Sequence, residues 1–247
     1  MPTGASLCIL LAPMLVGQGD WRPLWWLVLA TLAASLGAVF AQRRQYAVIG
    51  IRRQKGLADI RSALQQPTPW LLTLVFAAYA LQFFAVVIWL PTFLQEQRML
   101  SAGTTALLTA LVIAVNVPGN LAGGALLHRR INRGRLIATA SLVMGLAEIG
   151  IFSEALPDPL RYACCLLLTG AGGVIPAAVL SSSVVLAAKP QQIGTLQGLY
   201  LQGSNLGQFA GIPLIAAVVA ASGGRWQSAL VVTASACTAS IVLGLLV

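Results

Sequence analysis

The stretch Gly119-Asn-Leu-Ala-Gly-Gly-Ala-Leu-Leu-His-Arg-Arg-Ile-Asn-Arg-Gly-Arg135 joins two long apolar runs through a short basic turn. One run extends from about residue 102 to 127, and the other from 136 to about 151. In a lipid bilayer this pattern is typical of a helical hairpin whose turn is held on the cytoplasmic side by its arginines. The pattern therefore predicts a membrane hairpin, and the rest of the chain repeats it.

The composition places the whole chain in the class of polytopic membrane proteins. Apolar residues make up 58% of the 247 residues, charged residues only 9%, and the mean hydropathy is +0.85. A soluble domain carries roughly 25% charged residues. The net charge of +9 could indicate a nucleic-acid binder. However, the basic residues lie at the ends of apolar runs rather than on one solvated face, so we expect no nucleic-acid partner.

Eight apolar segments are candidates to cross the bilayer, each judged against the roughly 20 residues that a spanning helix needs. The longest segment between them, residues 42–69, carries six of the fifteen basic residues and a single aspartate. We expect this linker to lie along the membrane surface, where its basic residues suit anionic headgroups. The predicted spans are 3–18, 22–41, 70–95, 102–127, 135–155, 160–187, 194–221 and 226–247.

Lysine and arginine are distributed unequally between alternate loops. One side of the predicted topology collects eleven of them, in 42–69, in 128–135 and at Lys189. The other side has four, which are Arg22, Arg98, Arg161 and Arg225. Because positive loops stay inside, this bias predicts an inner (plasma) membrane protein whose linker is cytoplasmic.

Several short motifs are similar to those of the major facilitator superfamily. The basic turn resembles the cytoplasmic loop pattern Gly-x-Leu-x-Asp-x-x-Gly-Arg-Arg, with His128 at the aspartate position. Gly19-Asp-Trp-Arg22 resembles the turn between the fifth and sixth helices of that family, and cyanate-type permeases share a faint likeness there. Trp89-Leu-Pro-Thr-Phe-Leu94 and Gly207-Gln-Phe-Ala-Gly-Ile-Pro213 resemble parts of its seventh and eleventh helices. The residues of the basic turn that match are Gly124, Leu126, Arg129, Arg133, Gly134 and Arg135.

The resemblance implies an all-α fold that contains helices five to twelve of the family. Residues 1–41 would be the last two helices of the N-terminal half, 42–69 the linker, and 70–247 an intact C-terminal six-helix bundle. Helices one to four would be absent, so we expect a truncated form whose partner is either those helices or a second copy. The implied activity is transport of a small-molecule substrate by alternating access, without a cofactor.

One face of the predicted helix 194–221 is nearly bare backbone. Gly203, Gly207 and Gly211 recur at steps of four, which favours close helix packing and, as the alternative, direct substrate contact. Its flank carries Asn205 and Gln208, which predict either a cavity wall or hydrogen bonds between helices.

Two other predicted helices carry polar or aromatic stripes. Tyr79, Gln82 and Trp89 share a face of helix 70–95, and we expect them to line the substrate path or to pack. In helix 102–127, Pro118 removes a backbone donor and should bend the helix near Asn116, which suits a permeation path or a structural kink.

Glu148 is the one acidic residue well inside a predicted span, which makes it a candidate for ion coupling. His128, Arg129, Arg133 and Arg135 would form the cytoplasmic gate loop together with Gly124. One histidine and four scattered cysteines give little from which to build a metal site, and no enzyme constellation appears.

Two rival interpretations stay open at this level. The chain could be a complete eight-helix channel or small transporter, or a membrane remnant that does not transport and only packs against a partner.

The topology can be tested with single cysteines introduced into the loops. Cysteines at Gln54 and Asn132 should react with a membrane-impermeant thiol reagent only from the cytoplasmic side, and cysteines at Gln97 and Ser222 only from outside. Labelling of Gln54 from outside would overturn the orientation.

Overall fold

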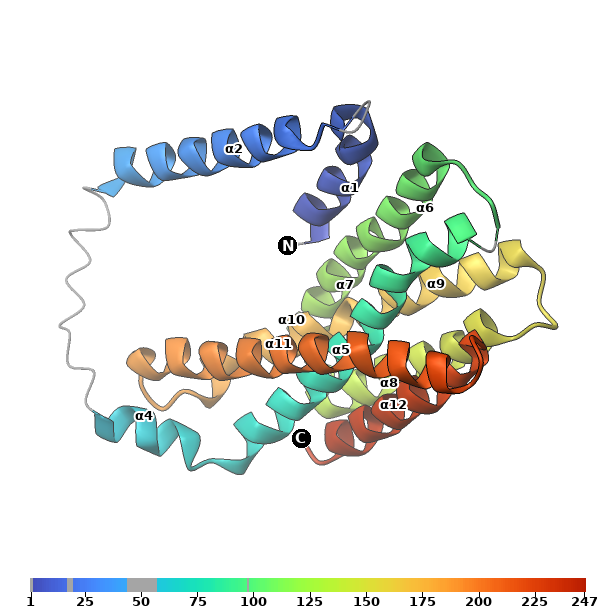
Figure 1. Ribbon diagram of the computed structural model, residues 1–247. Helices are drawn as coiled ribbons and strands as arrows, with labels where there is room; N and C mark the ends of the chain where they lie inside the picture. The colour runs from blue at the N-terminus through green and yellow to red at the C-terminus, as the bar shows by residue number, and fades with distance from the viewer. Residues whose placement is uncertain (1, 17–19, 44–56, 97) are drawn as a thin grey trace.

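The computed structural model describes residues 2–16, 20–43, 57–96 and 98–247, and this part of the chain contains helices without any strand (Figure 1). The remaining residues, including Gly19 and the linker residues 44–56, lie outside the described part. The helices are α1 (Pro2–Val16), α2 (Arg22–Ala41), α4 (Leu57–Leu64), α5 (Pro67–Glu96), α6 (Ala102–Ala114), α7 (Asn116–His128), α8 (Arg133–Phe152), α9 (Asp158–Gly172), α10 (Val174–Leu186), α11 (Pro190–Ala221) and α12 (Ala229–Leu245), the last preceded by a 3₁₀ turn at Trp226–Ser228.

Seven helices of the described residues are long and apolar enough to span a bilayer, with α6–α7 and α9–α10 each counted as one span. This confirms a polytopic, all-helical membrane protein. The first predicted span corresponds to α1, which has only 15 residues and is shorter than the usual spanning length. The predicted total of eight spans therefore stays a prediction.

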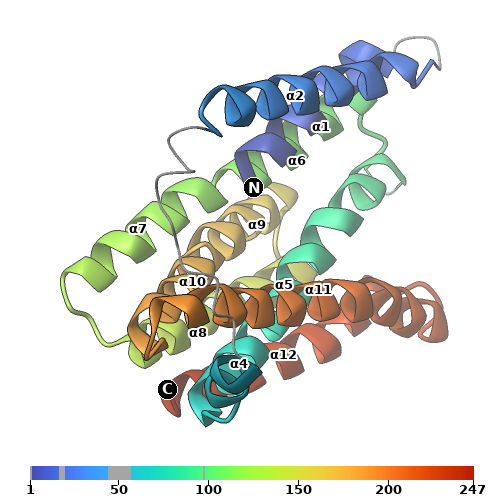
Figure 2. The same ribbon diagram turned by 90° about the vertical axis from the view of Figure 1, so that its left-hand side faces the viewer.

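Helices α5 to α12 form one bundle, and α1 and α2 lie beside it (Figures 1 and 2). Within the bundle, α11 packs along α5, α8 packs against both α12 and α9, and α10 packs on α7. The short helix α1 lies on α6, whereas α2 contains no buried residue. The buried core is therefore that of the bundle, and it is continuous from α5 to α11.

Helices α11 and α5 approach one another backbone to backbone along the glycine face. A Cβ atom added at Gly203 would lie 2.6 Å from the carbonyl oxygen of Thr73, and one at Gly207 would overlap the carbonyl of Ala77. One turn further, a Cβ at Gly211 would lie 2.7 Å from the Leu81 side chain. Lipid tails are as apolar as leucine, so helices in a bilayer gain from such close van der Waals contact rather than from hydrophobic burial.

Helix α4 is attached to the start of α11 at the end of the bundle that also holds the basic turn. The ammonium of Lys189 lies 2.7 Å from an Asp59 carboxylate oxygen. The Gln192 side chain donates to the Asp59 carbonyl at 3.2 Å and to the Ser62 hydroxyl at 2.8 Å. The same side chain accepts from the backbone N–H of Ala188 at 2.9 Å, so one amide joins the linker to the loop before α11.

Replacing Gly207 with leucine should destabilise the bundle, because the added side chain has no space against the Ala77 backbone. Forced overpacking of this kind costs about 1–3 kcal/mol or more. The matched control is Gly198→Leu on the same helix, where an added Cβ meets nothing within 4 Å. Thermal unfolding in detergent should show a lower midpoint for Gly207→Leu than for Gly198→Leu. Equal midpoints would contradict the close packing.

Candidate functional site

Two of the membrane spans are broken near their centres. The 27-residue span Ala102–His128 is interrupted at Val115, between α6 and α7. The interruption is a single residue that keeps helical dihedral angles (φ −63°, ψ −19°), and it stands where the Pro118 ring would crowd the carbonyl four residues earlier. The bend expected near Asn116 stays a prediction. The 29-residue span Asp158–Leu186 is interrupted at Gly173, and Pro176 follows three residues later. Gly173 also keeps helical dihedral angles, at φ −57° and ψ −23°, so each span continues past its interruption.

The two breaks pack directly on one another. A Cβ atom added at Gly173 would overlap the carbonyl of Asn116 and lie 2.8 Å from the backbone nitrogen of Asn120. A Cβ at Gly119 would overlap the carbonyl of Gly170 and lie 3.2 Å from the Cα of Gly173. Only glycine allows this approach, so the crossing brings the backbones of both spans into contact.

Asn116 joins three helices at this crossing. Its side-chain amide donates to the Tyr79 hydroxyl of α5 at 3.1 Å and to the Thr169 carbonyl of α9 at 2.9 Å. In turn its side-chain oxygen accepts from Asn120 at 2.7 Å. Both Asn116 and Thr169 are buried, and the Tyr79 ring stacks between Phe76 and Phe83. The structure therefore brings two of the proposed path residues, Tyr79 and Asn116, into direct contact.

Further polar atoms on α5 and α6 are buried without a hydrogen-bond partner among the described residues. They are the side-chain oxygen of Gln82 and the hydroxyls of Thr105 and Thr109. The Gln82 amide nitrogen donates to the Ala78 carbonyl at 3.0 Å, within its own helix. Each unpaired buried group costs roughly 1–3 kcal/mol, so this part of the bundle carries more polarity than packing alone requires.

Asn205 and Gln208 lie elsewhere. They occupy the flank of α11 that turns away from α5, where Asn205 is exposed and Gln208 half-buried. The residues proposed from the sequence as one path thus fall into three groups, of which Trp89 forms the third. Tyr79, Gln82 and Asn116 are inside the bundle, and Asn205 is on its surface.

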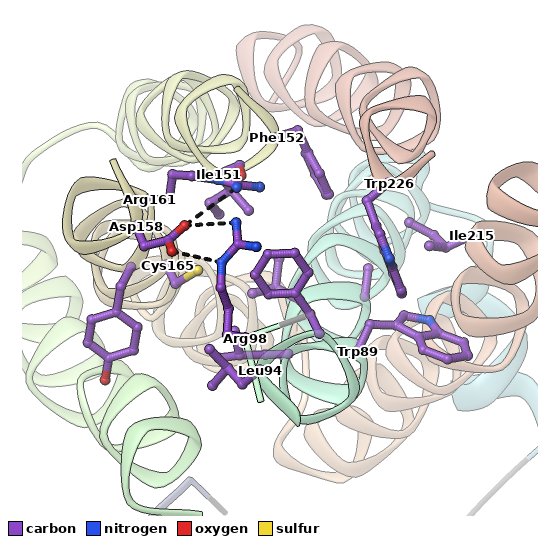
Figure 3. A pocket seen from close by; sticks show the side chains of 15 residues that line it. Trp89, Leu94, Arg98, Ile151, Phe152, Asp158, Arg161, Cys165, Ile215 and Trp226 are labelled. Atoms are coloured by element: carbon purple, nitrogen blue, oxygen red, sulfur yellow. Dashed lines mark hydrogen bonds and ion pairs between the residues drawn. The ribbon is translucent and has the colours of Figure 1, made fainter. Parts of the chain in front are cut away.

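Trp89 belongs to a third place, the end of the bundle opposite α4. Its ring lies 5.7 Å from that of Trp226, centroid to centroid. Both rings line a cavity of about 90 Å³ between α5, α8, α9, α11 and the 3₁₀ turn before α12 (Figure 3). An adjoining polar depression of about 550 Å³ shares Arg98, Asp158 and Arg161 with it.

The basic turn at the other end is shaped by the backbone. Arg130 adopts a positive φ of 62°, and the N–H of Ile131 donates to the Leu126 carbonyl at 3.2 Å, which closes the end of α7. Asn132 caps α8 by accepting from the Arg135 N–H at 2.9 Å. The gate-loop residues Gly124, His128, Arg129 and Arg135 are exposed, whereas Arg133 is half-buried and lies 3.5 Å from the Ser181 hydroxyl of α10.

Glu148 is fully buried between α8 and α12, where Thr233 and Cys237 face it. Neither carboxyl oxygen has a hydrogen bond of normal geometry to a described residue. Ser141 and Ser240, joined at 2.7 Å, continue the same polar seam. This seam lies on the α8–α12 side of the bundle and is separate from the crossing at Asn116.

Sequence reasoning missed the second break and the partners of Asn116. The sequence does contain a signal for this second interruption, because Gly172, Gly173 and Pro176 combine glycine and proline as Pro118 and Gly119 do near Asn116. No local signal marks the Thr169 carbonyl as a partner, because it is 53 residues away in the chain.

Seven long apolar helices of the described residues, with a polar crossing among them, define a polytopic α-helical membrane protein. The chain matches the family model of the Major Facilitator Superfamily over residues 1–212 and belongs to that superfamily. This membership points to a transporter rather than an enzyme.

A curated relative is the probable sulfoacetate transporter SauU of Cupriavidus necator. It is 34% identical over 100 residues, which are 36% of this chain and 23% of the relative. The matched region thus spans about a quarter of that protein's length.

The Tyr79–Asn116 contact can be measured with a double-mutant cycle. Tyr79→Phe should lower the free energy of unfolding by about 0.5–1.5 kcal/mol, and Asn116→Ala by more, because it also leaves the Thr169 carbonyl without its side-chain donor. The double variant should cost less than the sum of the two, since both changes remove the same hydrogen bond. Unfolding in SDS–detergent mixtures provides the energies, and strict additivity would show that the two side chains do not interact.

Proposed function

We propose that this chain forms part of a secondary transporter that moves a small solute through the inner membrane by alternating access. Its bundle supplies one wall of the path, and opposed helices supply the other. Membership of the superfamily supports the transport class. Prolines inside both interrupted spans support a wall that can bend, because proline removes a helical hydrogen bond.

The exposed amide of Asn205 carries the proposal. Asn205 lies halfway along the 32-residue helix α11, and its side chain makes no hydrogen bond to another described residue. Gln202 of the same face is also exposed. Moving such an amide into hydrocarbon without a partner costs roughly 2–7 kcal/mol, and two amides double that cost. This face of α11 therefore suits water or protein rather than lipid.

An alternating-access site needs a second wall, because it must close on one side while it opens on the other. The helices that face Asn205 would come from the family's helices one to four or from a second copy of this chain. Helix α1 already covers part of α6, and the Asn205 face of α11 is the exposed surface that such a partner would cover.

A small organic anion is the first substrate to test, because the relative is named for sulfoacetate. In the described helices, the lysines and arginines lie at or beyond the ends of the spans. A cationic side chain that pairs with an anionic substrate would then come from the opposing helices. Glu148 remains our candidate for ion coupling, as a buried carboxyl without a hydrogen-bond partner among the described residues.

Uptake of labelled sulfoacetate into proteoliposomes tests the proposal. The chain alone should not transport. Co-expression with a matching fragment of helices one to four should restore saturable uptake. In that preparation Asn205→Leu should lower uptake. The control is Leu206→Ala, at the exposed neighbouring residue, which should leave uptake unchanged. Saturable uptake by the chain alone as a monomer would instead favour the compact eight-helix transporter. Absence of uptake of any small solute in both preparations would favour the remnant that does not transport.

A further inference from the structure

The end of the bundle opposite α4 contains a small apolar chamber with a charged mouth. The chamber measures about 90 Å³ and is walled by side chains of the four helices α5, α8, α9 and α11, by Arg98 and by the 3₁₀ turn before α12; its aromatic walls include Trp89, Phe93, Phe152 and Trp226. Figure 3 shows the aromatic rings around the chamber and the arginines Arg98 and Arg161 grouped at one side of it. The chamber and the polar depression beside it share Phe93 and Trp226, so the two spaces adjoin.

The mouth carries an excess of positive charge. Arg98 holds Asp158 through two contacts, at 2.7 Å and 2.9 Å. Arg161 approaches the same carboxylate at 3.7 Å, and its side chain is only 15% exposed. Two guanidinium groups thus share one carboxylate, and both lie over the Phe93 ring, at 5.1 Å and 5.3 Å from its centroid.

The residues at the outer rim of the depression keep the net charge of the mouth positive. Arg225 lines the depression and donates from Nε to the Ser222 carbonyl at 3.1 Å. Glu154, the second acid of the rim, accepts from the Gln227 amide. Three arginines therefore face two carboxylates around the depression. Arg161 also donates from Nε to the Ile151 carbonyl at 2.8 Å, which fixes its guanidinium at the mouth. The excess of one positive charge around the depression would attract a further anion.

We propose that this pocket binds a short-chain organic anion, with its alkyl tail in the aromatic chamber and its carboxylate or sulfonate at the arginines. The size of the chamber sets the tail length. A cavity of roughly 150 Å³ accepts benzene, and one water occupies about 30 Å³ of liquid, so 90 Å³ accommodates about three carbon atoms. The site is distinct from the crossing at Asn116 and does not depend on the transport activity proposed above.

Binding is tested on the full purified chain in nanodiscs by saturation-transfer NMR with butane-1-sulfonate as the probe. Three carbons of that probe would enter the chamber and its sulfonate would meet the mouth. We expect saturable transfer that is strongest at the terminal methyl group. Butylammonium should bind at least severalfold more weakly because its charge is reversed, and hexane-1-sulfonate more weakly because its tail is too long.

Four variants separate the two parts of the pocket. Ala85→Leu places a larger side chain in the chamber wall and should abolish binding. Phe152→Ala enlarges the chamber and should shift the preference from butane- to hexane-1-sulfonate. Arg225→Gln should weaken binding about two- to fivefold, the range of a solvent-exposed ion pair. The control Arg22→Gln removes an exposed arginine that does not line the pocket and should leave binding unchanged.

The comparison of probes on the unmodified chain decides the outcome even if Ala85→Leu fails to fold. Equal binding of butylammonium and butane-1-sulfonate would overturn the role of the arginines. Absence of saturable transfer from butane-1-sulfonate, or an unchanged chain-length preference in a folded Phe152→Ala variant, would overturn the site itself.

Discussion

Close contact between helix backbones is the constraint on which the rest of this structure depends. In a bilayer the surrounding lipid is as apolar as the helix surfaces, so helices associate where small residues let them approach. Gly207 against Ala77 sets the α11–α5 contact, and Gly119 against Gly170 sets the crossing of the two broken spans. Gly134 approaches the Gly244 carbonyl in the same way, at the α8–α12 contact.

These contacts explain where the polar groups of the bundle lie. The α7–α9 approach at Gly119 places Asn116 within reach of the Thr169 carbonyl, and α5 adds the Tyr79 hydroxyl. An amide buried in lipid needs such partners, so the hydrogen bonds and the glycine contacts reinforce one another. The interruptions of both spans, each followed by a proline three residues later, lie at this crossing and are in backbone contact there.

The two ends of the bundle carry different arrangements of charge. At one end, Lys189 and Asp59 attach the linker helix α4 to α11, and the basic turn extends beyond the helices. At the other, Asp158 is shared between Arg98 and Arg161 above an aromatic chamber. Charges gather at both ends because the middle of a spanning helix tolerates them poorly. Glu148 is the exception among the described residues, and its burial between α8 and α12 is what keeps it a functional candidate.

The sequence by itself determined the membrane class, most of the spans and the place of the interruption before Pro118. Span 70–95 corresponds to Pro67–Glu96 and span 102–127 to Ala102–His128. These spans can be predicted because the length and hydropathy of a segment are local properties, and they decide whether it can cross a bilayer. The sequence also identified Asn116 and Tyr79 as candidate residues of the substrate path. Only the tertiary structure decided that these two side chains meet, that Asn205 lies on another face, and that Trp89 pairs with Trp226 at the far end. Those relations depend on the rotation and crossing of helices far apart in the chain, which are set by the packing of whole surfaces and leave no local pattern.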